Sequence, residues 1–292
     1  MPIKIAPRNE HRAGYSVPPV VRAIKVLRHI AEGHPVANQA QAARAIGINR
    51  TTLFRLLHTL EAEGLIEDVA GNGNFVLGAG ILELAGRKFS SLDVAQVASP
   101  VLARLASQTR LSCHLAILEG REVLYVVRQA PNVPLVSNVQ VGTRLPAHAA
   151  TMGRAILAHM PWDDVKERFR GRQLQAITSK TATTLADLAR QLEHDRAAGI
   201  SDSSSYYEVG IDSIAAPIFD HTGNVIAAIN VSGPERAFQG HEGRRNEITR
   251  ALIEAAREIC QRMGYAGQHD ALLVRSIAAN DSEAVDHVER PV

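Results

Sequence analysis

The side chains with the clearest chemistry lie in one short segment, from Arg50 to His58. Thr51, Arg55 and His58 are spaced four and three residues apart, so in a helix they share one face, which Arg50 and Thr52 flank. A guanidinium can donate two hydrogen bonds to a guanine edge, and a threonine can contact a thymine methyl group or a phosphate. These residue types at this spacing are suited to the major groove of double-stranded DNA.

The charge of the chain is unevenly distributed. The 292 residues carry 32 Lys and Arg against 30 Asp and Glu, a formal net charge of +2. The segment 20–60 alone has six basic residues and one acidic residue, whereas residues 266–292 have a net charge of −3. A basic segment in a balanced chain indicates a nucleic-acid partner. The alternative is a solvated helix face without a partner.

Two helices are predicted before the Arg50–His58 segment. Apolar residues at helical spacing from Val20 predict a first helix that ends near Gly33 and Pro35. Asn38 is the expected N-cap of a short second helix, which continues to Ile46. A tight turn at 47–49 then leads into the segment that carries the polar face.

A third helix and a hairpin complete this domain. The helix is expected over about 49–63, with its leucines on the side opposite Thr51, and Gly64 ends it. Two short strands, 65–69 and 75–77, flank a turn rich in Gly and Asn. Three helices followed by a hairpin predict a winged helix-turn-helix domain over residues 17–77. An ordinary amphipathic third helix, with no DNA contact, is the alternative.

The rest of the chain predicts a linker helix at 78–91 and a larger domain at 92–265. Hairpins at 113–128 and 213–232, a further strand at 135–141, and helices at 94–105, 151–159, 163–169, 185–198 and 241–263 indicate an antiparallel sheet covered by helices. The fold class is therefore α+β. Residues 1–16 are expected to form a mobile arm and residues 266–292 a mobile tail.

The composition excludes several classes of protein. Hydrophobic residues make up 46% of the chain and charged residues 21%, as in soluble globular proteins. No apolar run approaches the ~18 residues of a membrane span, and the N-terminus lacks the apolar stretch of a signal peptide. A cytoplasmic protein with no membrane partner is therefore expected. Two cysteines exclude a disulfide framework and a tetrahedral zinc site, and no cofactor or metal motif occurs.

An enzyme that uses Cys113 as a nucleophile is a rival interpretation, because His114 follows it directly. Adjacent residues of a strand point to opposite faces, however, so these two cannot form a nucleophile–base pair. His148 and Cys113 are better explained as core or pocket-wall residues. No catalytic residue is therefore expected.

The sequence resembles the IclR-type bacterial transcriptional regulators over nearly all of residues 20–265. The motifs that carry the resemblance are VRAIKVL (21–27), INRTTLFRLLHTLEAEGLI (48–66), FVLG (75–78), VGTRLPAHAATMGRAILA (141–158), IAAPIFD (214–220) and AINVSGP (228–234). The resemblance implies an N-terminal winged helix, a linker helix used in dimerisation, and a C-terminal GAF-like domain that binds a small effector, often an organic or aromatic acid. Dimers, or dimers of dimers, on pseudo-palindromic operator DNA are implied as well.

The resemblance also implies an effector site in the second domain. Its residues come from the LPAH segment, the helix start after it, and three neighbouring strands, and they are Leu145, Thr151, Met152, Ser203, Ser213, Asn230 and Ser232. Hydroxyls, an amide and backbone N–H groups can hold a carboxylate without a cationic side chain.

The chain departs from many relatives at two places. It has SSSY at 203–206 instead of an acidic run, and Asp212-Ser213 instead of Arg-Cys. The ligands of relatives cannot therefore be transferred to it. Tyr206 and Tyr207 could stack on an aromatic ligand or serve only in packing. A C-terminal domain that dimerises without binding a ligand stays an alternative.

Overall fold

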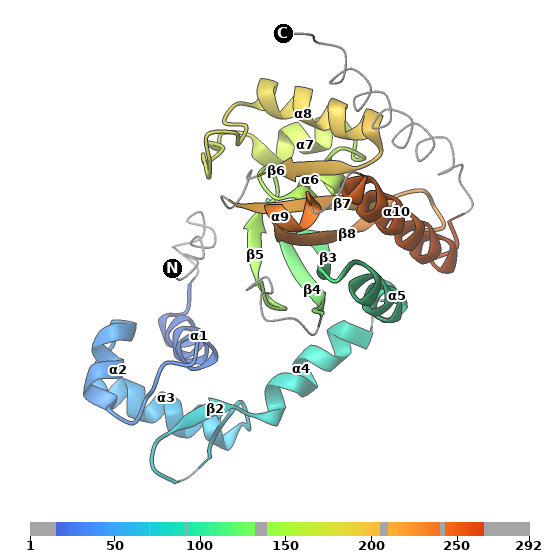
Figure 1. Cartoon of the computed structure of the whole chain (residues 1–292). Coiled ribbons are helices and arrows are strands. Elements are labelled where there is room, and N and C mark those ends of the chain that lie inside the picture. Colours follow the sequence, from blue (N-terminus) through green and yellow to red (C-terminus); the bar gives the residue numbers. More distant parts are fainter. Residues whose placement is uncertain are drawn as a thin grey trace, which may run out of the picture. The chain divides into compact units, whose positions relative to one another are not determined.

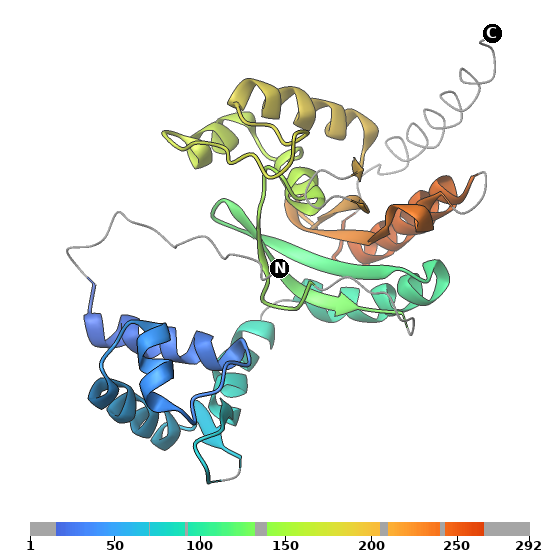
Figure 2. The same ribbon diagram turned by 60° about the vertical axis from the view of Figure 1, so that its left-hand side comes forward.

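The computed structural model describes residues 16–69, 71–90, 93–131, 139–204, 210–239 and 243–265. The expected tail, and the expected arm apart from Ser16, lie outside these ranges, as do Tyr206 and Tyr207. The chain divides into two compact units, Met1–Leu92 and Asp93–Val292, which Figures 1 and 2 show from two sides. Each unit is described by itself.

Unit 1 has the predicted order of three helices and a hairpin, followed by one more helix. Its elements are α1 (Pro18–Ala31), α2 (Gln39–Ile46), α3 (Arg50–Ala62), β1 (Ile66–Asp68), β2 (Phe75–Leu77) and α4 (Ala79–Ser90). The two strands pair antiparallel, with Ile66 opposite Leu77. The winged helix-turn-helix is therefore confirmed.

Local signals explain where the helices of unit 1 begin and end. The Gln41 N–H donates to Asn38 Oδ1 over 3.1 Å, and the Thr52 N–H donates to Asn49 Oδ1 over 2.7 Å. These caps satisfy N–H groups that have no partner within their own helix. Gly47, at φ +76°, ends α2 and allows the sharp turn into α3. The apolar sides of all three helices meet in one buried cluster that includes Val26, Ile30, Ala42, Ile46, Leu53, Leu57 and Leu60.

Unit 2 is a six-stranded antiparallel sheet with helices on both faces. Its strands are β3 (Ser112–Glu119), β4 (Glu122–Gln129), β5 (Arg144–Pro146), β6 (Ser201–Ser204), β7 (Ile211–Phe219) and β8 (Val225–Pro234), in the spatial order β5-β4-β3-β8-β7-β6. Its helices are α5 (Asp93–Thr109), α6 (Thr151–Leu157), α7 (Trp162–Phe169), α8 (Leu185–Ala198), α9 (Glu235–Phe238) and α10 (Arg244–Arg262). This arrangement confirms the α+β class.

The two faces of this sheet have different covers. Helices α5 and α10 pack side by side on one face, and α6 packs across β7 and β8 on the other, with α7 and α8 beyond it (Figures 1 and 2). Side chains alternate between the faces along each strand. Asp212 therefore points to the α10 side, and Ser213 points to the α6 side.

The prediction of a strand at 135–141 is wrong for residues 139–141, the part of this segment that the structure describes. Residues 135–138 lie outside the described ranges, and residues 139–141 are not in a strand. The chain turns there instead: the Thr143 N–H donates to the Gln140 carbonyl, and Gly142 takes a φ of +90°. The strand that pairs with β4 is β5, which begins at Arg144.

A buried ion pair joins α6 to α8. Arg154 and Asp195 are 1% and 2% exposed, and Arg154 Nε lies 3.0 Å from Asp195 Oδ2. The carboxylate also accepts hydrogen bonds from the Ser201 hydroxyl, at 2.8 Å, and from Gln191 Nε2, at 3.0 Å. Burial raises the pKa of Asp195, while Arg154 and these donors act in the opposite direction.

The edge strand β6 is held by arginines from two helices. Arg154, on α6, donates a hydrogen bond from Nη2 to the backbone carbonyl of Asp202. Arg245 of α10 donates to both carboxylate oxygens of Asp202 and, over 2.8 Å, to Asp212 Oδ2 on β7. These charged hydrogen bonds fix the position of Ser203, which lies next to Asp202 in β6.

Asp195→Ala is expected to destabilise unit 2 by about 3–5 kcal/mol, because Arg154 would remain buried without its counter-charge. Urea unfolding followed by the fluorescence of Trp162, the one tryptophan of the chain, measures this. The control is Glu167→Ala, which removes an exposed partner of Arg170 and should cost less than about 1 kcal/mol. Equal effects of the two variants would contradict the role given to the buried pair.

Candidate DNA interface and effector site

The N-terminal part of α3, from Arg50 to His58, presents the predicted polar residues to solvent. Arg50, Thr51, Arg55 and His58 are exposed, while Thr52 is half-buried. Leu53, Leu57 and Leu60 lie in the core of unit 1, so the opposite side of α3 is free for a partner. Among the described residues, no carboxylate lies within salt-bridge distance of Arg50 or Arg55.

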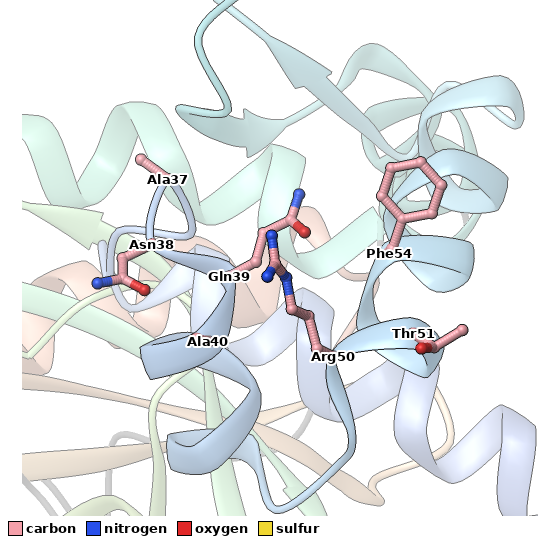
Figure 3. Close-up of a pocket in the computed structure, with 7 residues that line it drawn as sticks. All are labelled: Ala37, Asn38, Gln39, Ala40, Arg50, Thr51 and Phe54. Atoms are coloured by element: carbon pink, nitrogen blue, oxygen red, sulfur yellow. The ribbon is translucent and has the colours of Figure 1, made fainter.

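A shallow concavity lies between the N-terminal ends of α2 and α3. It is lined by Ala37, Asn38, Gln39, Ala40, Arg50, Thr51 and Phe54. In Figure 3 the side chains of Gln39 and Arg50 point toward one another, and Phe54 projects from the next turn of α3. The concavity therefore combines an amide, a guanidinium, a hydroxyl and an aromatic ring.

Phe54 is a residue that the sequence interpretation missed. Its side chain is 59% exposed, although aromatic residues usually occupy the core. The helical angle explains this exposure, because Phe54 lies between Arg50 and His58 around the helix axis and away from Leu53 and Leu57. An exposed aromatic ring on a basic helix face is a candidate for contact with a base.

Thr52 lies at a different surface from Thr51. It lines a second concavity together with Ala43, Gly47, Ile48, Asn49, and two arginines, Arg22 of α1 and Arg44 of α2. The structure thus divides the predicted DNA-binding residues between the outer side of α3, which holds Thr51, Arg55 and His58, and its junction with the turn after α2.

The predicted effector residues meet on the sheet face below α6. Thr151 Oγ1 lies 2.8 Å from Ser213 Oγ, and Asn230 Nδ2 donates to the same Ser213 oxygen over 2.9 Å. Asn230 Oδ1 lies 3.0 Å from His114 Nδ1. One hydrogen-bonded chain therefore links α6, β7, β8 and β3.

A row of serines crosses four strands beside this chain. Ser203 is opposite Ser213, Ser213 is opposite Ser232, and Ser232 is opposite Ser112. Directly opposed residues of antiparallel strands share a face, so all four hydroxyls lie on the α6 side. Ser112 was not predicted, since only the register of β3 against β8 shows its place in the row.

Leu145 and Met152 form the apolar side of the predicted site. Both are buried, at 2% and 0% exposure, in one cluster with Val123, Tyr125 and Ala228. The structure therefore brings all seven predicted effector residues to one side of the sheet, with polar groups on β6, β7, β8 and the start of α6, and apolar groups on β5 and α6.

His114 is the titratable group in this polar chain. Its ring is 1% exposed and makes an edge-on contact with Tyr125, with the ring centroids 5.3 Å apart. Burial lowers the pKa of His114 to about 4; the hydrogen bond with Asn230 partly opposes this shift, and the positive charge of Arg128 adds to it. Arg128 is opposite His114 on β4, so a cation borders the polar face.

Each of the two units matches a domain of one known protein family. Residues 19–70 match the IclR helix-turn-helix domain, and residues 87–261 match the bacterial transcriptional regulator IclR C-terminal domain. The chain belongs to the IclR family. Members of this family are DNA-binding transcriptional regulators, so the resemblance inferred from the motifs is confirmed.

Individual IclR-family proteins show how far the similarity extends. The Pca regulon regulatory protein of Pseudomonas putida is 32% identical over 251 residues, which are 84% of this chain and 83% of that protein. A putative transcriptional regulator from Rhodococcus sp. RHA1 has a TM-score of 0.73 at 31% identity, covering 85% of this chain and 98% of its own. An IclR homologue from Microbacterium hydrocarbonoxydans, crystallised with 4-hydroxybenzoate, has a TM-score of 0.71 at 28% identity. The match covers 84% of this chain and 98% of that homologue.

The departure from many IclR relatives at 212–213 has a structural explanation. Asp212 is 1% exposed and pairs with Arg245, whose guanidinium also lies over the ring of Phe238. An acid at position 212 therefore has its counter-charge on α10 and contributes nothing to the α6 face. Ser213 contributes its hydroxyl to that face instead.

The thiol-enzyme interpretation loses its physical basis in the structure. Cys113 is fully buried, and burial raises the pKa of its thiol to about 12, so a reactive thiolate does not form at neutral pH. His114 points to the other face of the sheet.

Among the described residues, no helix is long and apolar enough to cross a membrane, and no cluster of metal-ligating side chains occurs.

The free energy of unfolding of unit 2 is expected to fall as the pH drops from about 6.5 to 4. An unfolded histidine takes up a proton near pH 6.5, whereas folded His114 does so only near pH 4, so protonation favours the unfolded chain. For this one residue the loss is roughly 3 kcal/mol at most.

The contribution of His114 is measured as a difference between two pH series. Urea unfolding of the wild type and of His114→Asn, followed by Trp162 fluorescence, should show a weaker pH dependence in the variant. Burial also lowers the pKa of His148 and His159, so part of the dependence remains. Identical slopes in the two proteins would contradict the assignment.

Proposed function

We propose that this IclR-family regulator binds operator DNA with the outer side of α3 and changes its operator affinity when a small organic acid binds below α6. The observation that carries the proposal is the hydrogen-bonded chain from Thr151 to His114 in unit 2, because a few polar groups held in fixed positions beside apolar side chains are the usual lining of a small-molecule site. The protein acts in the cytoplasm in this account.

For DNA binding, we infer that the N-terminal part of α3, from Arg50 to His58, enters the major groove. Arg50, Thr51, Arg55 and His58 are exposed there, and Thr52 adds a hydroxyl near Arg22 and Arg44. Two copies of the chain, joined in part through α4, would place their α3 helices in successive major grooves, with half-sites about 34 Å apart or a multiple of that. A dimer or a dimer of dimers would do so on a pseudo-palindrome.

For effector binding, we infer that a carboxylate is held by neutral donors. The Thr151 and Ser213 hydroxyls, the Asn230 amide, and the serines at 203 and 232 lie on one face, with Leu145 and Met152 beside them. The Microbacterium homologue that was crystallised with 4-hydroxybenzoate supports an aromatic acid as one candidate. No cofactor is required.

Footprinting of the DNA beside the chain's own gene tests the proposal, with and without a panel of aromatic and short-chain acids. A protected palindrome whose protection changes with one acid is the expected result. The coupling should be worth about 1–3 kcal/mol, a 5- to 150-fold change in operator affinity. Protection that no acid alters would contradict the effector part and favour a C-terminal unit that only dimerises.

Arg55→Ala is expected to weaken operator binding by about 1–3 kcal/mol and to relax the base preference at one position, if the guanidinium reads a guanine edge. Binding of the variant to every single-base change of the operator measures this. Arg170→Ala, which removes an exposed arginine of unit 2, is the control and should leave the preference unchanged. A uniform loss across all sequences would assign Arg55 to a phosphate.

Phe54→Ala is expected to weaken binding by about 1 kcal/mol, because the ring covers a thymine methyl group. Replacing each operator thymine by deoxyuridine removes one methyl group at a time. At one or two positions this replacement should weaken wild-type binding and have no effect on Phe54→Ala. The control Phe54→Leu should stay sensitive to the methyl group; equal sensitivity of wild type and Phe54→Ala would rule the contact out.

A further inference from the structure

One ring nitrogen of His114 has no hydrogen-bond partner among the residues that the structure describes. Its Nδ1 lies 3.0 Å from Asn230 Oδ1, whereas Nε2 is buried and has no hydrogen-bond partner in the part of the chain that the structure describes. The ring itself is 1% exposed. Buried polar atoms in folded proteins are nearly always satisfied by protein, water or a ligand, so this atom needs an explanation.

The neighbouring hydrogen bonds determine which kind of partner Nε2 needs. Asn230 donates through Nδ2 to Ser213 Oγ, so its carbonyl oxygen faces His114 and can only accept. His114 Nδ1 must therefore carry the proton. With the ring neutral at physiological pH, since its pKa is about 4, Nε2 presents a bare lone pair.

The lone pair on His114 Nε2 disfavours a carboxylate as its partner and favours a hydrogen-bond donor. A carboxylate offers only acceptor oxygens, which repel another acceptor, whereas a hydroxyl group can donate to Nε2. The serine row that includes Ser213 and Ser232 lies two residues along the strands from the row that holds His114 and Asn230, a separation of about 7 Å. The two rows thus offer different chemistry at the two ends of one ligand.

We propose that the effector is a hydroxy acid whose hydroxyl group donates a hydrogen bond to His114 Nε2. The inference rests on the proposed function, because it names the chemical class of the effector for the same site. The carboxylate lies toward the serine row and Thr151, where neutral donors are available. His114 acts as the residue that distinguishes a hydroxylated acid from its parent acid.

Calorimetric titration of the full chain with three matched acids tests the proposal. The acids are 4-hydroxybenzoate, benzoate, and 4-methoxybenzoate, whose ether oxygen accepts a hydrogen bond but cannot donate one. The hydroxylated acid should bind about tenfold more tightly than either of the others, because a site built around a hydroxyl group rejects analogues that lack it. Lactate and propionate form a second pair for a short-chain site.

Two variants locate the preference at His114. His114→Asn should reduce the preference for the hydroxylated acid to about twofold or less, through weaker binding of that acid alone. His148→Asn is the matched control, because its ring is also buried but its Nε2 is already bonded to the Gln175 carbonyl. This control should keep the full preference, and both variants should bind operator DNA without an acid.

Nitrogen-15 NMR of the histidines reads the protonation of His114 directly. The ligand-free protein should show proton-bearing Nδ1 and bare Nε2, and the Nε2 signal should shift only when a hydroxylated acid binds. A proton on Nε2, or equal binding of hydroxylated and parent acids, would overturn the inference and leave the proposed function standing. Equal binding is also what a permanently bound water at Nε2 would give. Failure of every acid to bind would instead contradict the proposed function itself.

Discussion

The ion pair between Arg154 and Asp195 is the constraint on which the rest of unit 2 depends. Both side chains are almost fully buried, so neither can lose its partner without leaving a charge in the interior. Through this pair α6 is fixed to α8, and through the Asp202 carbonyl it is fixed to the edge strand β6. An apolar contact could slide, whereas this ion pair is held further by the hydrogen bonds that Asp195 accepts from Gln191 and Ser201.

That geometry places the polar groups of the proposed effector site. Thr151 lies one turn before Arg154 on α6, and Ser203 follows Asp202 on β6, so the same pair orients hydroxyls from both elements. From the other side of the sheet, Arg245 holds Asp202 and Asp212. The α6 face can then carry a chain of neutral donors and acceptors in fixed positions, which is what discrimination between similar small acids requires.

The part of the fold that the sequence predicts is the part that local interactions determine. Asn38 caps α2 as expected, and the leucines of α3 fall into the core, because capping and helical periodicity involve residues close together in the chain. The three-residue strand β5 was misplaced, since nothing local marks Arg144–Pro146 apart from its pairing with β4. The family motifs led to the proposed effector residues, although their hydrogen bonds to one another could not be read from the sequence.

The residues that the sequence did not single out for the proposed sites are placed by the fold. Phe54 is exposed because its angle on α3 turns the ring away from Leu53 and Leu57, although its residue type is common in cores. His114 follows Cys113 in the sequence, whereas its hydrogen-bond partner Asn230 lies 116 residues further along the chain. The pairing of Asp212 with Arg245 likewise joins two elements that only the folded sheet brings together.

The central claim is that acid binding in unit 2 and operator binding by unit 1 are coupled, and a measurement of reciprocity tests it most directly. Operator affinity is measured with and without saturating acid, and acid affinity with and without saturating operator. Linkage requires the two ratios to be equal, and the account predicts a common factor between about 5 and 150. Ratios of one in both directions, for an acid that binds, would contradict it.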